Sequence, residues 1–211
     1  MKENNFVIYN RGFFDAVLQR VQEAAGEDHV VPQQGDAPRN VFFLAGAGGT
    51  GKTFLYRCLC NELFRLGKMF VCTAWTGIAA QLLRDGKTCT RGFGIPLQSL
   101  DHNSMSWIKL QTKSAEELRT ASVIFWDEVA MAPQESLRVA HDLLCGIMQK
   151  PGQDPVQQPF AGKIIVFSGD FRQILPVMPG TNEAMVIIFV DVIILSILVL
   201  QNKIVVHSTA M

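Results

Sequence analysis

Short apolar runs alternate with helical patterns along most of this 211-residue chain. An opening helix is predicted by apolar residues at 3.6-residue spacing, from Phe14 through Val17 and Leu18 to Val21. Four later runs are typical of buried strands, because they are short, continuous and bounded by turn residues. These predicted strands cover residues 41–45, 69–73, 122–126 and 163–167.

Helical patterns fill the intervals between the strands. The predicted helices cover residues 54–66, 77–84 and 133–149. Gly67 is expected to end the first of them, and Pro133 fits the first turn of the third, where a missing N–H costs little. Ser114 and Glu117 form a capping-box pattern that predicts a further brief helix. Strands that alternate with helices predict an α/β fold, a doubly wound parallel sheet with helices on both faces and its ligand site at the carboxyl ends of the strands.

A glycine-rich segment follows the first predicted strand directly. It reads Gly46-Ala47-Gly48-Gly49-Thr50-Gly51-Lys52-Thr53 and matches G-x-x-x-x-G-K-[ST]. Its glycines let backbone N–H groups converge on phosphate oxygens, and the next helix offers its positive N-terminus. We expect Lys52 to reach the β- and γ-phosphates and Thr53 to ligate Mg²⁺. The segment therefore predicts a P-loop NTPase that binds ATP and Mg²⁺, and an ordinary glycine-rich turn is the weaker interpretation.

Two carboxylates, Asp127 and Glu128, follow the third apolar run. At the carboxyl end of a buried strand after a P-loop, they are the expected second half of the site. Asp127 would hold Mg²⁺ through water, and Glu128 would orient and deprotonate the attacking water. The alternative is a solvated pair that caps the next segment, although two carboxylates directly after four apolar residues need a partner.

Composition restricts the partners of this domain. Lysine plus arginine equals aspartate plus glutamate, at 19 each, so any nucleic-acid contact must come from a local groove. The five cysteines fall at no zinc-ligand spacing, which predicts buried free thiols in a reducing compartment and no metal cluster. The N-terminus has neither a signal-peptide apolar region nor an arginine-rich transit pattern, so we expect an intracellular protein.

Several segments together resemble the PIF-type DNA helicases, which include the Helitron-transposon helicases and are superfamily-one motors with RecA-like domains. Besides the P-loop and its flanks, these segments are Ala74-Trp75-Thr76-Gly77-Ile78-Ala79-Ala80, Trp126-Asp127-Glu128 with Met131, and Gly169-Asp170-Phe171-Arg172-Gln173-Ile174-Leu175-Pro176-Val177. The last segment is far more discriminating than the P-loop, which many unrelated families share. The resemblance spans about residues 14–180.

The resemblance also implies roles for individual residues. Gln173 matches the residue that senses the γ-phosphate and couples hydrolysis to the grip on DNA. Asn10 stands where the family has a glutamine that reads adenine, and its amide has a shorter reach. The residues implied to lie against single-stranded DNA are Thr76, Gly77, Phe93 and Pro96. Thr90 and Arg91 replace the histidine–serine pair usual before this phenylalanine. Trp75 either stacks on a base or packs in the core.

The resemblance implies three parts. Residues 1–40 form a helix and loop that lead to the motor, residues 41–180 form a RecA-like ATPase domain, and residues 181–211 form a divergent apolar tail. A second helicase domain, which would supply an arginine for catalysis, does not fit in the 31 residues after Gly180. We therefore expect nucleotide binding with little hydrolysis, and no unwinding by this chain alone.

The apolar tail is open to several interpretations. The run 186–200 is shorter than the ~20 residues that a membrane-spanning helix needs, and Asp191 interrupts it. Its valine and isoleucine content favours one or two buried strands, with a membrane anchor or a truncated gene as alternatives.

By resemblance, the intact enzyme is an ATP-dependent DNA helicase that translocates 5′ to 3′ on single-stranded DNA. It would serve repair, recombination and telomere maintenance, in the nucleus or alternatively the mitochondrion. One rival is a P-loop kinase or NTP-dependent switch, which leaves residues 169–177 unexplained. Another is a catalytically dead, membrane-tethered nucleotide-binding module.

Overall fold

One six-stranded parallel sheet, in the order β3-β2-β4-β5-β1-β6, forms the centre of the computed structural model. The structure describes residues 2–26, 40–98, 100–150, 158–170 and 205–208. The strands are β1 (Val41–Ala45), β2 (Phe70–Ala74), β3 (Lys87–Thr88), β4 (Val123–Asp127), β5 (Ile164–Gly169) and β6 (Val205–Ser208). The parallel α/β sheet predicted from the alternation of strands and helices is confirmed.

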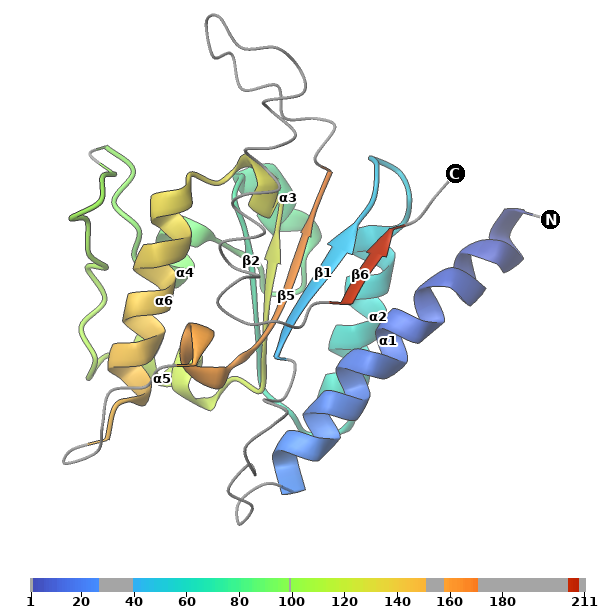
Figure 1. The fold of residues 1–211 in the computed structure, drawn as a ribbon, viewed down its shortest axis with the longest axis horizontal. Coiled ribbons are helices and arrows are strands. Elements are labelled where there is room, and N and C mark those ends of the chain that lie inside the picture. The colour runs from blue at the N-terminus through green and yellow to red at the C-terminus, as the bar shows by residue number, and fades with distance from the viewer. Residues whose placement is uncertain (1, 27–39, 99, 151–157, 171–204, 209–211) are drawn as a thin grey trace, which may run out of the picture.

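Helices cover both faces of this sheet (Figure 1). One face carries α1 (Lys2–Gly26), α2 (Lys52–Arg65) and α3 (Gly77–Leu82). The other carries α4 (Cys89–Phe93), α5 (Lys113–Thr120) and α6 (Gln134–Met148). Two short 3₁₀ turns, η1 (Val129–Met131) and η2 (Pro159–Gly162), lie between β4 and α6 and before β5. The central strands are therefore buried on both sides, which explains why β1, β4 and most of β5 are apolar without alternation.

Successive residues of each central strand contribute to the two faces in turn. In β4, Val123 and Phe125 pack with α1, α2 and α3, whereas Ile124 and Trp126 pack with α4, α5 and α6. All four side chains are fully buried. Trp126 stacks on Phe93 of α4, with 4.9 Å between ring centroids and 24° between ring planes. Burial of aromatic rings on both faces fixes the strand that delivers the acidic residues to the edge of the sheet.

Several element boundaries differ from those predicted. Helix α3 ends at Leu82 rather than at residue 84. Helix α5 is capped by Thr112, whose hydroxyl accepts from the N–H of Ala115 at 3.4 Å, and not by Ser114. Pro133 precedes α6 as its N-cap instead of lying inside the first turn. β3 and α4 were not predicted, because elements of two and five residues are too short to show a periodic pattern.

The ends of the chain are described only in part. Strand β6 pairs with β1, and the sequence did not predict it. The apolar run 186–200 lies outside the described residues, so the strands expected there stay a prediction. Within the described ranges, no helix combines the length and the apolar character that crossing a membrane requires.

Candidate functional site

The P-loop between β1 and α2 adopts backbone conformations that require glycine. Gly49 has a φ of 77° and Gly51 a φ of 82°, in the left-handed region that other residues rarely enter. Lys52 begins α2, and its ammonium group donates to the carbonyl oxygens of Gly46 at 2.5 Å and Ala47 at 2.9 Å. The lysine is therefore folded over the loop, where phosphate oxygens can replace the two carbonyls as its acceptors.

The first turn of α2 supplies the other predicted ligand group. Thr53 is half-buried, and its hydroxyl makes no hydrogen bond within the described part of the chain. Gly48 is exposed at the tip of the loop, and Thr50 donates its hydroxyl to the carbonyl of Ala47 at 2.8 Å. The hydroxyl of Thr50 thus stabilises the loop, whereas the hydroxyl of Thr53 is available to a ligand.

Asp127 ends β4 with one carboxylate oxygen bound and the other available. The residue is 8% exposed. Its Oδ1 accepts from the hydroxyl of Ser168 and from the N–H of Glu128 at 2.9 Å. Its Oδ2 makes no hydrogen bond to any residue that the structure describes. A carboxylate that is fixed through one oxygen and has the second available suits a metal held directly or through water.

Glu128 follows in a left-handed backbone conformation, with φ 55°. Its Oε2 accepts from the hydroxyl of Thr76 at 2.6 Å and from the N–H of Thr76 at 3.3 Å. Like Oδ2 of Asp127, its Oε1 makes no hydrogen bond to a described residue. The side chain is half-exposed, so water reaches it.

Strand β5 joins the P-loop to the acidic residues, because it lies between β1 and β4 in the sheet. The carbonyl of Gly169 accepts from the N–H of Gly46 at 3.3 Å, and the neighbouring Ser168 holds Asp127. A Cβ atom at Gly169 would lie 3.1 Å from the Cβ of Ala130, which is tighter than ordinary contact. Two consecutive residues of one strand thus bring both halves of the predicted site to the same edge of the sheet.

Two further residues beneath the site were not predicted from the sequence. Ser168 is fully buried, and only the register of β5 beside β4 shows that it faces Asp127. Tyr56 of α2 is also buried and donates its hydroxyl to the carbonyl of Val166 at 3.3 Å. Burial, helped by the negative charge of Asp127, raises the pKa of Tyr56 well above its ordinary value. The phenol therefore remains a protonated donor beneath the carboxyl end of the sheet.

Two of the residues assigned to the nucleotide by resemblance are not tested. Gln173 lies outside the described residues. Asn10 belongs to α1, but its side chain lies outside the described part of the structure. Both assignments stay predictions.

The structure places the residues predicted to contact DNA in different environments. Gly77 is exposed at the start of α3, and Thr76 caps that helix by accepting from the N–H of Ala79 at 3.3 Å. Pro96 is half-buried. Phe93 requires a correction: it is completely buried against Trp126, so it supports the core and offers no surface to a strand. Trp75, which had two interpretations, is partly buried and packs against the same core.

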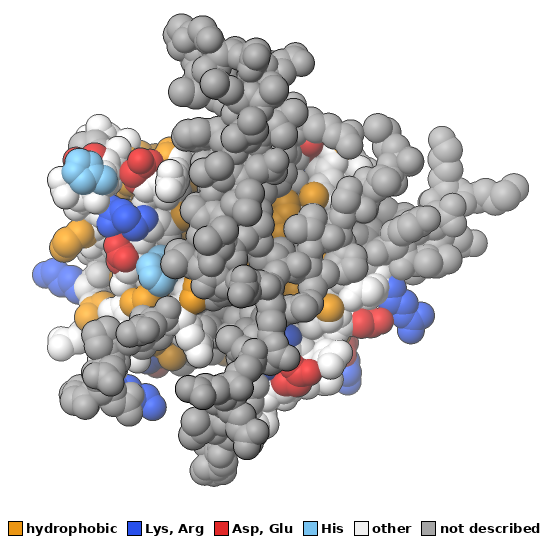
Figure 2. Space-filling view, in the orientation of Figure 1, with side chains coloured by type: hydrophobic (Ala, Val, Ile, Leu, Met, Phe, Trp, Pro, Cys, Tyr) orange, Lys and Arg blue, Asp and Glu red, His pale blue; other side chains and the backbone are white. Residues whose placement is uncertain are grey.

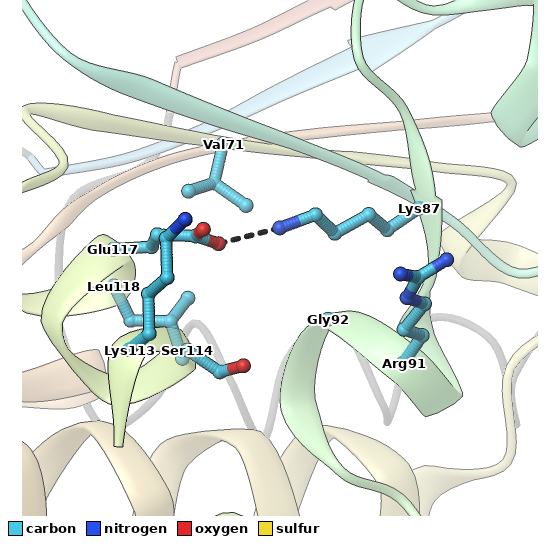
Figure 3. A pocket seen from close by; sticks show the side chains of 8 residues that line it. All are labelled: Val71, Lys87, Arg91, Gly92, Lys113, Ser114, Glu117 and Leu118. Carbon is cyan, nitrogen blue, oxygen red and sulfur yellow. Dashed lines mark hydrogen bonds and ion pairs between the residues drawn. The ribbon is translucent and has the colours of Figure 1, made fainter. Parts of the chain in front are cut away.

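A pocket of about 270 Å³ lies at the β3 side of the sheet, lined from β2, β3, α4 and α5 (Figure 3). No P-loop residue and neither acidic residue of the site lines it. Lys87 crosses it to form an ion pair with Glu117 at 2.5 Å. Arg91 and Lys113 also line the pocket, and neither forms an ion pair with a described residue. The pocket is thus a locally basic surface on a chain of zero net charge, separate from the P-loop.

Among the described residues, the remaining charged groups and thiols form no second cluster. In Figure 2, basic and acidic side chains lie interspersed over the coloured part of the surface. Within the described ranges, no three His, Cys, Asp or Glu side chains are grouped as a metal site. None of the five cysteines, which all lie within the described ranges, forms a disulfide; Cys60, Cys72 and Cys89 are buried as predicted, whereas Cys58 and Cys145 are half-buried. Burial raises the pKa of Cys89, which keeps this thiol protonated and unreactive.

Comparisons with known proteins agree on one family. The sequence profile of a family described as "PIF1-like helicase" matches residues 18–202. The ATP-dependent DNA helicase PIF3 of Trypanosoma brucei brucei is 28% identical over 133 residues, which is 63% of this chain and 15% of that protein. The ATP-dependent DNA helicase PIF1 of Candida albicans is 30% identical over 142 residues, 66% of this chain and 15% of that protein. The chain thus spans a small part of the length of these relatives.

Solved structures give the same result for the fold. The Pif1 helicase from Bacteroides in complex with ADP-AlF₃ and single-stranded DNA is 25% identical, with a TM-score of 0.54 over 80% of this chain and 35% of that one. The Pif1 helicase from Candida albicans is 24% identical, with a TM-score of 0.54 over 77% of this chain and 33% of that one. The predicted RecA-like P-loop NTPase fold is confirmed.

Proposed function

Because the chain belongs to the PIF1-like helicase family, we propose that it binds ATP with Mg²⁺ and carries the hydrolytic site of a DNA helicase motor. The observation that supports this proposal most directly is the pair of bonds made by β5. Gly169 binds the start of the P-loop, and Ser168 binds Asp127. The phosphate loop and the metal-binding carboxylate are thereby held at one edge of the sheet, where ligands of doubly wound folds bind.

The residues present fit a magnesium nucleotide. Thr53 and Oδ2 of Asp127 are oxygen donors with no hydrogen bond to a described residue, and Mg²⁺ prefers such ligands. The ion would neutralise phosphate charge when bound. Lys52 would exchange its two loop carbonyls for phosphate oxygens, and Glu128 would accept the proton of the water that attacks the γ-phosphorus as ADP leaves. Gln173 would sense the γ-phosphate, by resemblance.

Single-stranded DNA is the proposed partner of this motor. The exposed Gly77 and the basic pocket with Arg91 and Lys113 offer close approach and positive charge, as a phosphate backbone requires. The proposed roles of the whole enzyme are unwinding in DNA repair, recombination and telomere maintenance, in the nucleus. They rest on family resemblance, as does the division into residues 1–40, 41–180 and 181–211.

Lys52→Ala tests nucleotide binding. Loss of charge-assisted bonds to phosphate should weaken Mg·ATP binding by about 100-fold, corresponding to ~3 kcal/mol. The measurement is a titration with a fluorescent ATP analogue in the presence of Mg²⁺. Lys109→Ala, at an exposed position away from the loop, is the matched control and should bind like the unmodified chain. Equal affinities for both variants would disprove the proposed site.

Glu128→Gln tests the proposed base. The amide cannot accept a proton, so single-turnover hydrolysis should fall by about 100-fold or more while Mg·ATP affinity stays within about threefold. Glu135→Gln, in the first turn of α6, is the control. A Glu128→Gln chain that hydrolyses ATP at the unmodified rate would rule out this base.

The DNA partner needs a separate test. The chain should be joined to a second helicase domain, and its ATP hydrolysis measured with and without a single-stranded oligonucleotide. If the chain is part of a helicase motor, the oligonucleotide should stimulate ATP hydrolysis, and the double variant Arg91→Ala, Lys113→Ala should reduce this stimulation. A hydrolysis rate that the oligonucleotide leaves unchanged would instead favour an NTP-dependent switch.

A further inference from the structure

Thr76 connects the end of β2 to both the start of α3 and the proposed base. Its hydroxyl accepts from the N–H of Ala79 at 3.3 Å and donates to Oε2 of Glu128 at 2.6 Å. Its own N–H approaches the same carboxylate oxygen at 3.3 Å. The hydroxyl is thus used as donor and acceptor at once, and neither function is available to valine.

The backbone around Glu128 is already fixed by other contacts. Its N–H donates to Oδ1 of Asp127 at 2.9 Å, and its carbonyl accepts from the N–H of Met131 at 3.0 Å. Only the side-chain torsions remain to be set, and the bonds to Thr76 set them. With Oε2 held in this way, Oε1 has no hydrogen bond to a described residue and keeps a defined direction. A general base oriented by a third group in this manner has the geometry that catalysis requires.

We propose that Thr76 is the positioning residue of Glu128, so that the β2–α3 junction controls the rate of ATP hydrolysis. This inference rests on the proposed function, in which Glu128 is the base. Thr76 and Gly77 form the segment proposed to lie along single-stranded DNA. A DNA strand that shifts this junction therefore moves Glu128 directly, through its hydrogen bond to Thr76 and without a longer relay.

Three substitutions at one position separate this role from helix capping. Thr76→Val removes both the cap and the bond to Glu128. Thr76→Asp keeps an oxygen that caps α3, since aspartate is a good N-cap, but places a like charge beside Glu128. Thr76→Ser keeps both interactions. Single-turnover hydrolysis of Mg·ATP should fall about 30-fold for valine and aspartate, and stay within about threefold for serine, while nucleotide affinity changes little in all three.

The same substitutions in the Glu128→Gln background distinguish positioning from a general structural effect. Without a base to position, Thr76→Val should reduce the residual rate by less than about twofold. An equal loss in both backgrounds, or full activity of Thr76→Val or Thr76→Asp, would overturn the inference. If instead the unmodified and Glu128→Gln chains hydrolyse ATP alike, the proposed function itself fails, and the two failures are therefore separable.

Discussion

At the carboxyl end of the parallel sheet, the acidic side chains keep oxygen atoms available for a ligand, whereas at the amino end polar side chains are bound by the protein itself. Asp127 and Glu128 each bind a neighbour through one carboxylate oxygen and leave the other without a hydrogen bond to a described residue. At the opposite end, Lys163 precedes β5, and its ammonium group donates to the carbonyls of Arg119 at 2.5 Å and Ala121 at 2.9 Å.

Asn40, directly before β1, shows the same use at the amino end. It is 6% exposed, and its amide donates to the carbonyl of Gly162 at 2.6 Å and accepts from the guanidinium of Arg20 at 2.6 Å. Its backbone carbonyl also accepts from the N–H of Ile165 at 2.7 Å. These contacts join α1, the start of β1 and the start of β5. The contacts at the amino end thus fix where the strands begin. Because the strands are fixed there, the carboxyl end can carry loops and carboxylates that keep one oxygen available.

Asn40→Ala should produce the largest effect on stability at the amino end. It removes a buried acceptor of the Arg20 guanidinium and the donor to Gly162, so the free energy of unfolding should fall by about 3 kcal/mol. Urea denaturation measures this, and Asn103→Ala, at an exposed position, should change it by less than about 0.5 kcal/mol. The folded variant should still bind Mg·ATP with the affinity of the unmodified chain. A loss of nucleotide affinity would contradict the view that the amino end of the sheet serves stability and the carboxyl end serves binding.

Ser168→Ala should have a smaller and different effect, because it acts at the carboxyl end. Asp127 would lose the hydroxyl that orients its carboxylate, and the Mg²⁺ concentration needed for nucleotide binding should rise about tenfold, or ~1.4 kcal/mol. A Mg²⁺ titration at fixed ATP analogue measures this. Ser136→Ala is a matched control, since Ser136 is equally buried but donates to the carbonyl of Pro133, far along the chain from β5. An equal shift in both variants would contradict the assigned role of Ser168.

The elements predicted from sequence are those whose signal is local. β1 and β4 were identified because strands buried on both faces are continuously apolar, and the P-loop because its glycines are required by backbone geometry. Ser168 could not be identified, since its partner depends on strand register. Phe93 was assigned to DNA by resemblance, although it stacks on Trp126 in the core. Packing, which depends on residues distant in sequence, decides such positions.

The capping of α5 shows the same limit at smaller scale. Thr112 and Ser114 both carry hydroxyls near the start of the helix, and the sequence pattern favoured Ser114 because Glu117 follows at capping-box spacing. In the structure Glu117 instead pairs with Lys87 of β3, and the helix begins at Lys113. The capping-box prediction depended on Glu117, and in the structure this side chain instead pairs with a lysine that is distant in sequence.

Lys163 provides the smallest and most specific test of the comparison between the ends. Burial, with a contribution from the charge of Arg119, lowers the pKa of Lys163 to about 8. Between this value and the unfolded value near ~10.4, the unfolded chain binds more protons, so stability rises with pH through that window, and the destabilisation is fully present below it. The neutral amine still donates to both carbonyls. Relative to Lys163→Met, the unmodified chain should gain about 1 kcal/mol from pH 7.5 to pH 10, allowing for partial solvent access. Urea denaturation measures this, and Lys150→Met, at an exposed site, should show no such dependence on pH. If the difference in unfolding free energy between the unmodified chain and Lys163→Met did not change with pH, burial of Lys163 would not destabilise the fold.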